Sequence, residues 1–223
     1  MDLSKAPLGS GYTLLFFTPA EASTIDALVA EIIPDEQGSP GARGAGVVEY
    51  IDHSLAGYLH ELQPLYRDGI RALSEYASAR FGATLRFLDD RRREAVVEEL
   101  DNLVAADPQD PQDPQDRLGE FFRLVREHTV QGYFGDPAYG GNRDAAGWAL
   151  LGFPGAQRGY SLDQLKPGFD GSQIPILTVN DLYRQIYARR LAPTNEGTAG
   201  APNAAEISFD EPDASAQRRV DDD

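Results

Sequence analysis

Three histidines and the acids around them are the side chains of this chain that could bind a metal. His60 and Glu61 begin the His-Glu-x-x-His pattern, in which two histidines one helical turn apart hold zinc. Position 64, however, is Pro64 rather than the second histidine. His53 could share a helix face with His60, but no carboxylate nearby completes a set of three ligands. We expect no metal site and interpret the histidines, His128 included, as solvated or capped surface residues.

Motifs for nucleophilic catalysis and for nucleotide binding are missing from the sequence. It holds no Gly-x-Ser-x-Gly elbow that would present a serine. It also has no cysteine, which excludes thiolate nucleophiles, thiolate zinc sites and iron–sulfur clusters. The glycines between Gly38 and Gly46 follow a helix rather than a strand, which is the wrong context for a dinucleotide loop. The sequence therefore predicts no catalytic residue and no cofactor-binding residue.

One glycine-rich stretch, residues 136–144, combines an aromatic residue with both signs of charge. Gly140 and Gly141 let a backbone approach another surface closely, and two adjacent glycines make a poor self-packing loop. Tyr139 offers a flat apolar ring with a polar tip, and Arg143 offers a planar donor fork. Aromatic and arginine anchors are typical of protein interfaces. The alternative is a loop that packs only on its own bundle.

The predicted partner interface joins this loop to a later helix. Arg143 is expected to be held by Asp136 or Asp144 of the same loop, and so to present its fork outward. Two adjacent glycines are expected to make room for the backbone of a second protein. The predicted interface residues are Pro137, Tyr139, Gly140, Gly141, Asn142, Arg143, Trp148, Phe153, Pro154, Leu182, Tyr183, Ile186 and Tyr187.

The loop must be held by the helices around it, which the spacing of apolar residues predicts. Thr18-Pro19-Ala20-Glu21 predicts a helix start, with a capping threonine, a proline at the first position and a glutamate that completes a capping box. Apolar repeats predict further helices over about 47–62, 64–81, 90–104 and 117–133 and a short one through Trp148. Asp89 or Asp90 can cap the helix over 90–104, and a second capping-box pattern, Thr178–Asp181, opens the last helix. No alternation of period two indicates strands. The predicted fold is all-α, a bundle of five to six helices with an extended C-terminal arm.

The 223 residues divide by composition into a helical domain and two appendages. We predict a helical domain over 12–156, an arm with one helix over 157–192, and an acidic, disordered tail over 193–223. Within the domain, 107–116 repeats Asp-Pro-Gln three times and is predicted to be an extended linker, because proline at every third residue opposes a helix. The apolar residues of the arm are expected to lie on a partner.

Charge restricts the partners that the chain can bind. It has 36 acidic residues against 20 lysines and arginines, a formal net charge of −16. Binding to phosphates needs a cationic face, so nucleic acid is not an expected partner. No apolar run approaches the roughly 18 to 20 residues that cross a bilayer, so no direct membrane insertion is expected.

Several motifs resemble one known family. They are Phe16–Glu21, Ile32-Ile33-Pro34, Pro40-Gly41-Ala42, Ala45–Asp52 and, most specifically, Asp136-Pro137-Ala138-Tyr139-Gly140-Gly141-Asn142-Arg143-Asp144 with Trp148 and Gly152-Phe153-Pro154-Gly155. Together they cover about residues 16–156 and resemble the gluconate 2-dehydrogenase subunit 3 family. The Asp-Pro-x-Tyr-Gly-Gly-Asn-Arg stretch carries most of this resemblance.

The resemblance implies a non-catalytic, chaperone-like small subunit of a bacterial sugar, polyol or glycoside dehydrogenase. Such a subunit binds, stabilises and helps to mature a large catalytic subunit of the glucose–methanol–choline (GMC) oxidoreductase type. FAD would lie in that partner rather than in this chain, and a cytochrome c subunit completes some complexes. The interface residues predicted above would then contact the large subunit.

Two other functions stay open on the residues alone. One is a free-standing helical scaffold without a flavoprotein partner, and the other is a self-sufficient hydrolase that uses Asp136, Asp144 and His128. Many members of the family carry a twin-arginine export signal, whereas Lys5 is the only basic residue before Arg43 here. We therefore expect a cytoplasmic location, or a periplasmic one if such a leader has been removed.

Overall fold

The structure is a computed structural model that describes residues 12–106, 110 and 113–191. Within these residues it contains seven α-helices and no strand, which confirms the all-α prediction. The helices are α1 (Pro19–Ile32), α2 (Val47–Ala56), α3 (Gln63–Phe81), α4 (Asp90–Ala105), α5 (Pro114–Phe134), α6 (Ala146–Leu151) and α7 (Val179–Leu191). None of the helices so described is long and apolar enough to cross a membrane. The predicted tail over 193–223 lies outside the described residues.

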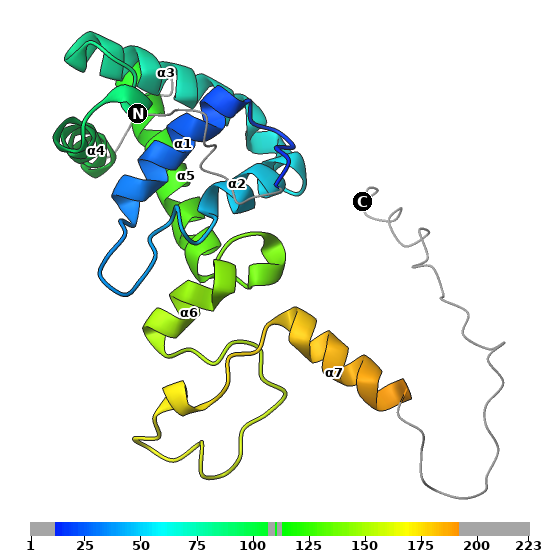
Figure 1. Cartoon of the computed structure of the whole chain (residues 1–223). Coiled ribbons are helices and arrows are strands. Elements are labelled where there is room, and N and C mark those ends of the chain that lie inside the picture. Colours follow the sequence, from blue (N-terminus) through cyan, green and yellow to red (C-terminus); the bar gives the residue numbers. More distant parts are fainter. Residues whose placement is uncertain (1–11, 107–109, 111–112, 192–223) are drawn as a thin grey trace, which may run out of the picture.

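Helix α5 is the central element of a five-helix bundle. It contacts α1, α2, α3 and α4, and α6 follows beyond its C-terminal end (Figure 1). Its buried face carries Phe121, Phe122 and Val125, which are almost wholly inaccessible to solvent. Gly69 lets α3 pack closely against α5, because a Cβ there would lie 2.2 Å from the Phe121 ring. Burying each such side chain contributes roughly 1.5–3 kcal/mol, so this face fixes the bundle.

The predicted capping boxes are both confirmed. Thr18 accepts a hydrogen bond from the Glu21 backbone at the start of α1, and the Glu21 side chain accepts one from the Thr18 backbone. Thr178 and Asp181 exchange the same two bonds at the start of α7. These caps depend only on residues three positions apart, which is why local sequence reveals them.

Two predicted boundaries are wrong, each for a local reason. The helix expected over 47–62 ends at Ala56, where Gly57 leaves the helical conformation, and Tyr58 is 69% exposed. The linker expected over 107–116 ends early, because its last repeat opens α5 with Asp113 as N-cap and Pro114 in the first turn. A proline costs no hydrogen bond in the first turn of a helix.

His128 is a third correction, since it is buried rather than solvated. It lies on the inner face of α5, where its Nδ1 is 2.7 Å from the Tyr66 hydroxyl and the two rings are stacked. Burial lowers the pKa of His128, because the surrounding apolar groups disfavour the charged ring. The neutral imidazole is therefore part of the bundle core.

This burial predicts that acid weakens the fold. The unfolded chain keeps a histidine pKa near the ordinary 6.5, above that of folded His128. Between the two values the unfolded state binds more protons, so the free energy of unfolding falls as the pH is lowered from 7 through 6.5 and below. In His128→Gln, which keeps a polar partner for Tyr66 but does not titrate, the decline between pH 7 and 5 should be shallower. Urea unfolding at several pH values measures both slopes, and equal slopes would contradict the prediction.

Candidate functional site

The glycine-rich loop between α5 and α6 adopts a conformation that the rest of the structure must hold in place. It contains two short 3-10 turns, Pro137–Tyr139 and Arg143–Ala145. Asn142, Asp144 and Ala145 all have positive φ angles, between 46° and 57°. Each such residue costs of order 1 kcal/mol, and clusters of them are typical of functional sites. The contacts that offset this cost show how the loop is built.

Asn142 closes the loop from the inside. Its side chain is completely buried, its Nδ2 donates to the Gly135 carbonyl at 2.8 Å, and its Oδ1 accepts from the Gly147 backbone at 2.8 Å. The amide therefore joins the end of α5 to the start of α6. A buried side chain with these partners serves the loop itself.

Arg143 pins the loop to the N-terminus of α2, which corrects the predicted pairing with Asp136 or Asp144. Its Nη2 pairs with Glu49 Oε1 at 2.5 Å, and its Nη1 donates to the Gly44 carbonyl at 3.2 Å. Asp136 is engaged elsewhere, because its two oxygens accept from the Ala138 and Val179 backbones. The sequence could not reveal the pair with Glu49, which lies 94 residues away.

The two adjacent glycines are indeed places where a second backbone comes close, but that backbone belongs to the same chain. A Cβ on Gly141 would lie 2.1 Å from the carbonyl oxygen of Gly132 in α5. Gly140 has a φ of 103° and its missing Cβ would face α2 at ordinary contact distance. The expectation of a second protein at this point is therefore corrected.

Trp148 and the motif that follows it tie the C-terminal arm to the bundle. The indole is buried, its Nε1 donates to the Phe134 carbonyl at 2.7 Å, and the Phe153 ring meets it edge-on. The Pro154 carbonyl then accepts from the Leu177 backbone, and the Leu177 carbonyl accepts from Ala156. These bonds hold the segment just before α7 against residues 154–156.

Several apolar side chains of the loop and arm remain exposed. Ile174 is buried within the chain, contrary to expectation, and Leu182 and Ile186 are half-buried. Others have no cover, and Leu162 is 85% exposed. The exposed apolar residues from the loop to α7 are Tyr139, Leu150, Leu151, Phe153, Tyr160, Leu162, Leu165, Tyr183 and Tyr187. Large exposed apolar patches are typical of protein interaction sites. Helix α7 itself stands away from the bundle (Figure 1).

The structure thus separates the predicted interface residues into three groups by burial. Gly141, Asn142 and Trp148 are internal and hold the loop, whereas Tyr139, Phe153, Tyr183 and Tyr187 offer apolar surface and Gly140 is also exposed. The half-buried residues are Pro137, Arg143, Pro154, Leu182 and Ile186. Contact of this set with a partner stays a prediction.

Sequence reasoning missed an apolar groove beside Tyr139. It has a volume of about 520 Å³, and its walls come from the end of α2, the N-terminal segment and the loop. Its lining residues are Leu15, Tyr50, His53, Ser54, Ala56, Gly57, Tyr58 and Tyr139. Gly57 was the signal for it, because a glycine that ends α2 is what turns Tyr58 out of the helical stripe.

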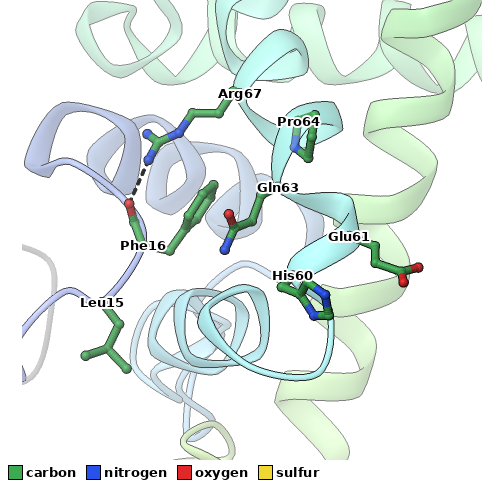
Figure 2. Close-up of a pocket in the computed structure, with 7 residues that line it drawn as sticks. All are labelled: Leu15, Phe16, His60, Glu61, Gln63, Pro64 and Arg67. Atoms are coloured by element: carbon green, nitrogen blue, oxygen red, sulfur yellow. Dashed lines mark hydrogen bonds between the residues drawn. The ribbon is translucent and has the colours of Figure 1, made fainter.

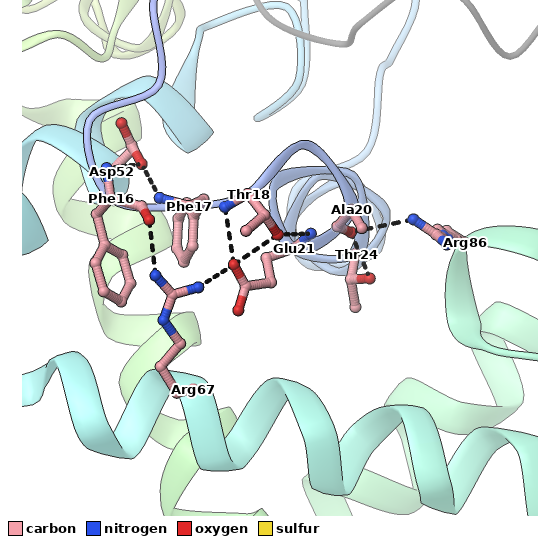
Figure 3. Close-up of polar contacts among 9 residues, drawn as sticks. All are labelled: Phe16, Phe17, Thr18, Ala20, Glu21, Thr24, Asp52, Arg67 and Arg86. Atoms are coloured by element: carbon pink, nitrogen blue, oxygen red, sulfur yellow. Dashed lines mark hydrogen bonds and ion pairs between the residues drawn. The ribbon is translucent and has the colours of Figure 1, made fainter.

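The N-terminal segment that forms one wall of this groove is held by a buried carboxylate. Asp52 of α2 accepts hydrogen bonds from the backbones of Leu15, Phe16 and Phe17 at 2.7–3.0 Å, and from the Tyr12 hydroxyl at 2.9 Å. Figure 3 shows the carboxylate facing this segment just ahead of α1. Burial and the neighbouring Asp52 raise the pKa of Tyr12, so its hydroxyl stays a donor.

Arg67 of α3 holds the same segment from the other side. Its guanidinium lies over the Phe16 ring, 4.2 Å from the centroid, donates to the Phe16 carbonyl and pairs with Glu21. A second hollow of about 580 Å³ opens here, lined by Leu15, Phe16, His60, Glu61, Gln63, Pro64 and Arg67 (Figure 2). Leu15 lines both hollows, so the clamped segment is their shared wall.

The geometry gives no support to the hydrolase hypothesis. His128 is in the core with Tyr66, and both oxygens of Asp136 accept backbone hydrogen bonds. A general base must reach a substrate, and a buried, hydrogen-bonded imidazole does not. Among the described residues, no group of three or more acidic or histidine side chains is placed to hold a metal ion.

These features define a helical protein in which the polar side chains of loop 136–144 hold the loop in place. Its exposed apolar side chains are of the kind that a protein partner can cover. The model of the family described as gluconate 2-dehydrogenase subunit 3 matches residues 19–155, and the chain belongs to that family. It is thus related by family to an accessory subunit of a dehydrogenase complex. No curated protein and no solved structure matches the chain.

Proposed function

We propose that this chain is a non-catalytic small subunit that binds, stabilises and helps to mature the catalytic subunit of a sugar, polyol or glycoside dehydrogenase. The proposed partner is a large FAD-binding subunit of the GMC oxidoreductase type, which would hold the only flavin of the pair. A cytochrome c subunit would complete the complex as electron acceptor. Family membership supports the existence of a dehydrogenase partner.

One observation carries the proposal: apolar side chains stay uncovered beyond the bundle. Asp136, Asn142 and Arg143 of the loop make hydrogen bonds within the chain. In contrast, the rings of Tyr139, Phe153, Tyr183 and Tyr187 are each about half exposed. Keeping such rings in water is unfavourable, and burying them against another protein releases roughly 25 cal/mol per Å². The same observation disfavours a free-standing scaffold, which would leave this surface in water.

Co-expression tests the proposal directly. The large FAD-binding subunit of a dehydrogenase from the same organism is produced with and without this chain, and flavin absorbance per polypeptide is measured. We expect the two proteins to co-purify, and the large subunit made alone to be poorly soluble or several-fold lower in FAD. The purified small chain serves as the control and should carry no flavin.

Each result has a distinct meaning. Failure of the two proteins to co-purify would refute the subunit assignment. Co-purification with equal flavin loading in the two preparations would refute the maturation role alone. A stoichiometric flavin absorbance in the isolated small chain would show that the cofactor assignment is wrong.

A further inference from the structure

We propose that the groove between Tyr58 and Tyr139 is an anchor site for an uncharged, apolar segment of the catalytic subunit. The proposal rests on the proposed function, because it takes that subunit as the occupant. It adds the place on this chain where the partner inserts and the chemistry of the inserted segment. The sequence motifs contain two of its lining residues, Tyr50 and Tyr139, but the groove itself is formed only in the folded chain.

The chemistry follows from the charge of the lining. A quarter of the chain is charged and its net charge is −16, yet none of the eight lining residues is Asp, Glu, Lys or Arg. A basic or acidic segment would lose its hydration there without gaining a counter-charge. An apolar side chain has no such cost and displaces water from the exposed faces of Leu15, Tyr58 and Tyr139. The lining therefore selects an uncharged segment even though the whole chain attracts cations.

The groove is also held open in one shape, which is what a binding anchor requires. The Tyr58 hydroxyl is 2.9 Å from that of Tyr50, and Tyr50 donates to Gln131 Oε1 at 3.1 Å. Another lining residue, Leu15, has its backbone N–H fixed by Asp52 at 2.7 Å. Side chains that are ordered before binding lose little entropy on binding, so a partner gains more from each contact.

The groove is connected to the exposed arm through the loop. Tyr139 lines the groove, and Asp136, three residues earlier, accepts at 2.8 Å from the Val179 backbone where α7 begins. One rigid loop thus carries both the groove wall and the attachment of α7. A catalytic subunit covered by the arm would meet the groove at the same loop, which favours it over an unrelated occupant.

The size of the groove fits an anchor rather than a whole element. A volume of about 520 Å³ falls within the roughly 300–1,000 Å³ of pockets that take small groups, so it accepts a few side chains. Two other occupants have to be distinguished by experiment. One is residues 1–11 of this chain, which come shortly before the lining residue Leu15 in the sequence, and the other is a second copy of the chain.

A charge placed in the groove tests the proposal by competition. Ala56 is exposed at the end of α2, where a lysine favours the helix, so Ala56→Lys changes the groove without harming the fold. Ala79→Lys is the matched control, since Ala79 is exposed in the last turn of α3 and lines neither the groove nor the arm. Variant and wild-type full-length chains with different tags are co-expressed with the catalytic subunit, and their ratio in the purified complex is measured.

We expect Ala56→Lys to be under-represented at least about thirtyfold, the effect of losing an interface anchor, and Ala79→Lys to compete equally. Equal incorporation of Ala56→Lys, with the wild type assembled, would overturn the groove assignment and leave the proposed function intact. If the wild-type chain does not assemble at all, the proposed function fails instead.

A photo-crosslinker identifies the occupant. Benzoyl-phenylalanine replaces Tyr58 in the assembled complex. The control replaces Phe87, an aromatic residue that is also exposed and lies beside α1 and α3. We expect position 58 alone to crosslink to the catalytic subunit, at a segment without charged residues. Crosslinks to a charged segment, to residues 1–11 or to a second copy would each overturn the proposal.

Discussion

A Gly141→Ala variant should lose about 3 kcal/mol or more of its free energy of unfolding. The added Cβ would lie 2.1 Å from the carbonyl oxygen of Gly132, 2.8 Å from its carbonyl carbon and 3.0 Å from its Cα. All three atoms belong to the backbone of α5, so no side chain can rotate away. Either the loop or the end of α5 must shift, and the hydrogen bonds of Asn142 are then lost.

Gly159→Ala is the matched control for this variant. A Cβ at Gly159 meets no atom within 4 Å, and its φ is not in the left-handed region. We expect this change to alter the free energy of unfolding by less than about 0.5 kcal/mol. Urea unfolding followed by circular dichroism compares the two, and equal midpoints would show that the loop does not depend on this contact.

The sequence predicts those features of the fold that depend on residues close together in the chain. Helix starts at Thr18, Asp89 and Thr178 depend on side chains that cap the backbone two to three residues later, and the structure has all three caps. Helical spacing also predicts the burial of His128, because this residue lies three positions after Val125 and seven after Phe121 on one face of the helix. The position of a polar residue on a core stripe thus indicates its burial better than its residue type does.

The candidate site was less predictable, because its contacts join distant parts of the chain. The sequence indicates that something approaches Gly141 closely, but not that the approaching backbone is Gly132 of α5. It shows Arg143 among nearby aspartates, whereas the folded chain offers Glu49 from α2. Local charge proximity predicts ion pairs poorly when a rigid turn points the side chain elsewhere. The groove has the same origin, since three separate segments form its walls.

Replacement of Asp52 by alanine should have the second large effect, a loss of about 3 to 5 kcal/mol. Asp52 is fully buried, and its two oxygens accept from the backbones of Leu15, Phe16 and Phe17 and from the Tyr12 hydroxyl. Alanine removes the acceptor of the three backbone N–H groups, of which that of Phe17 is buried, and leaves the Tyr12 hydroxyl with the Glu49 carbonyl alone. Asp52→Asn keeps the shape but turns one acceptor into a donor, and should lose a smaller part of the same stability.

Asp68→Ala provides the control, because Asp68 pairs with Arg71 on the exposed face of α3 and such pairs contribute roughly 0–1 kcal/mol. Urea unfolding gives the three stabilities, and limited proteolysis with chymotrypsin reports on cleavage after Phe16 and Phe17. We expect cleavage there to increase in Asp52→Ala before the bundle unfolds, since the carboxylate clamps this segment to α2. Stability and cleavage equal to those of Asp68→Ala would show that the segment is held by apolar contacts alone. In that case Leu15 would keep its place in the groove wall without Asp52, and the clamp would not be what preforms the groove.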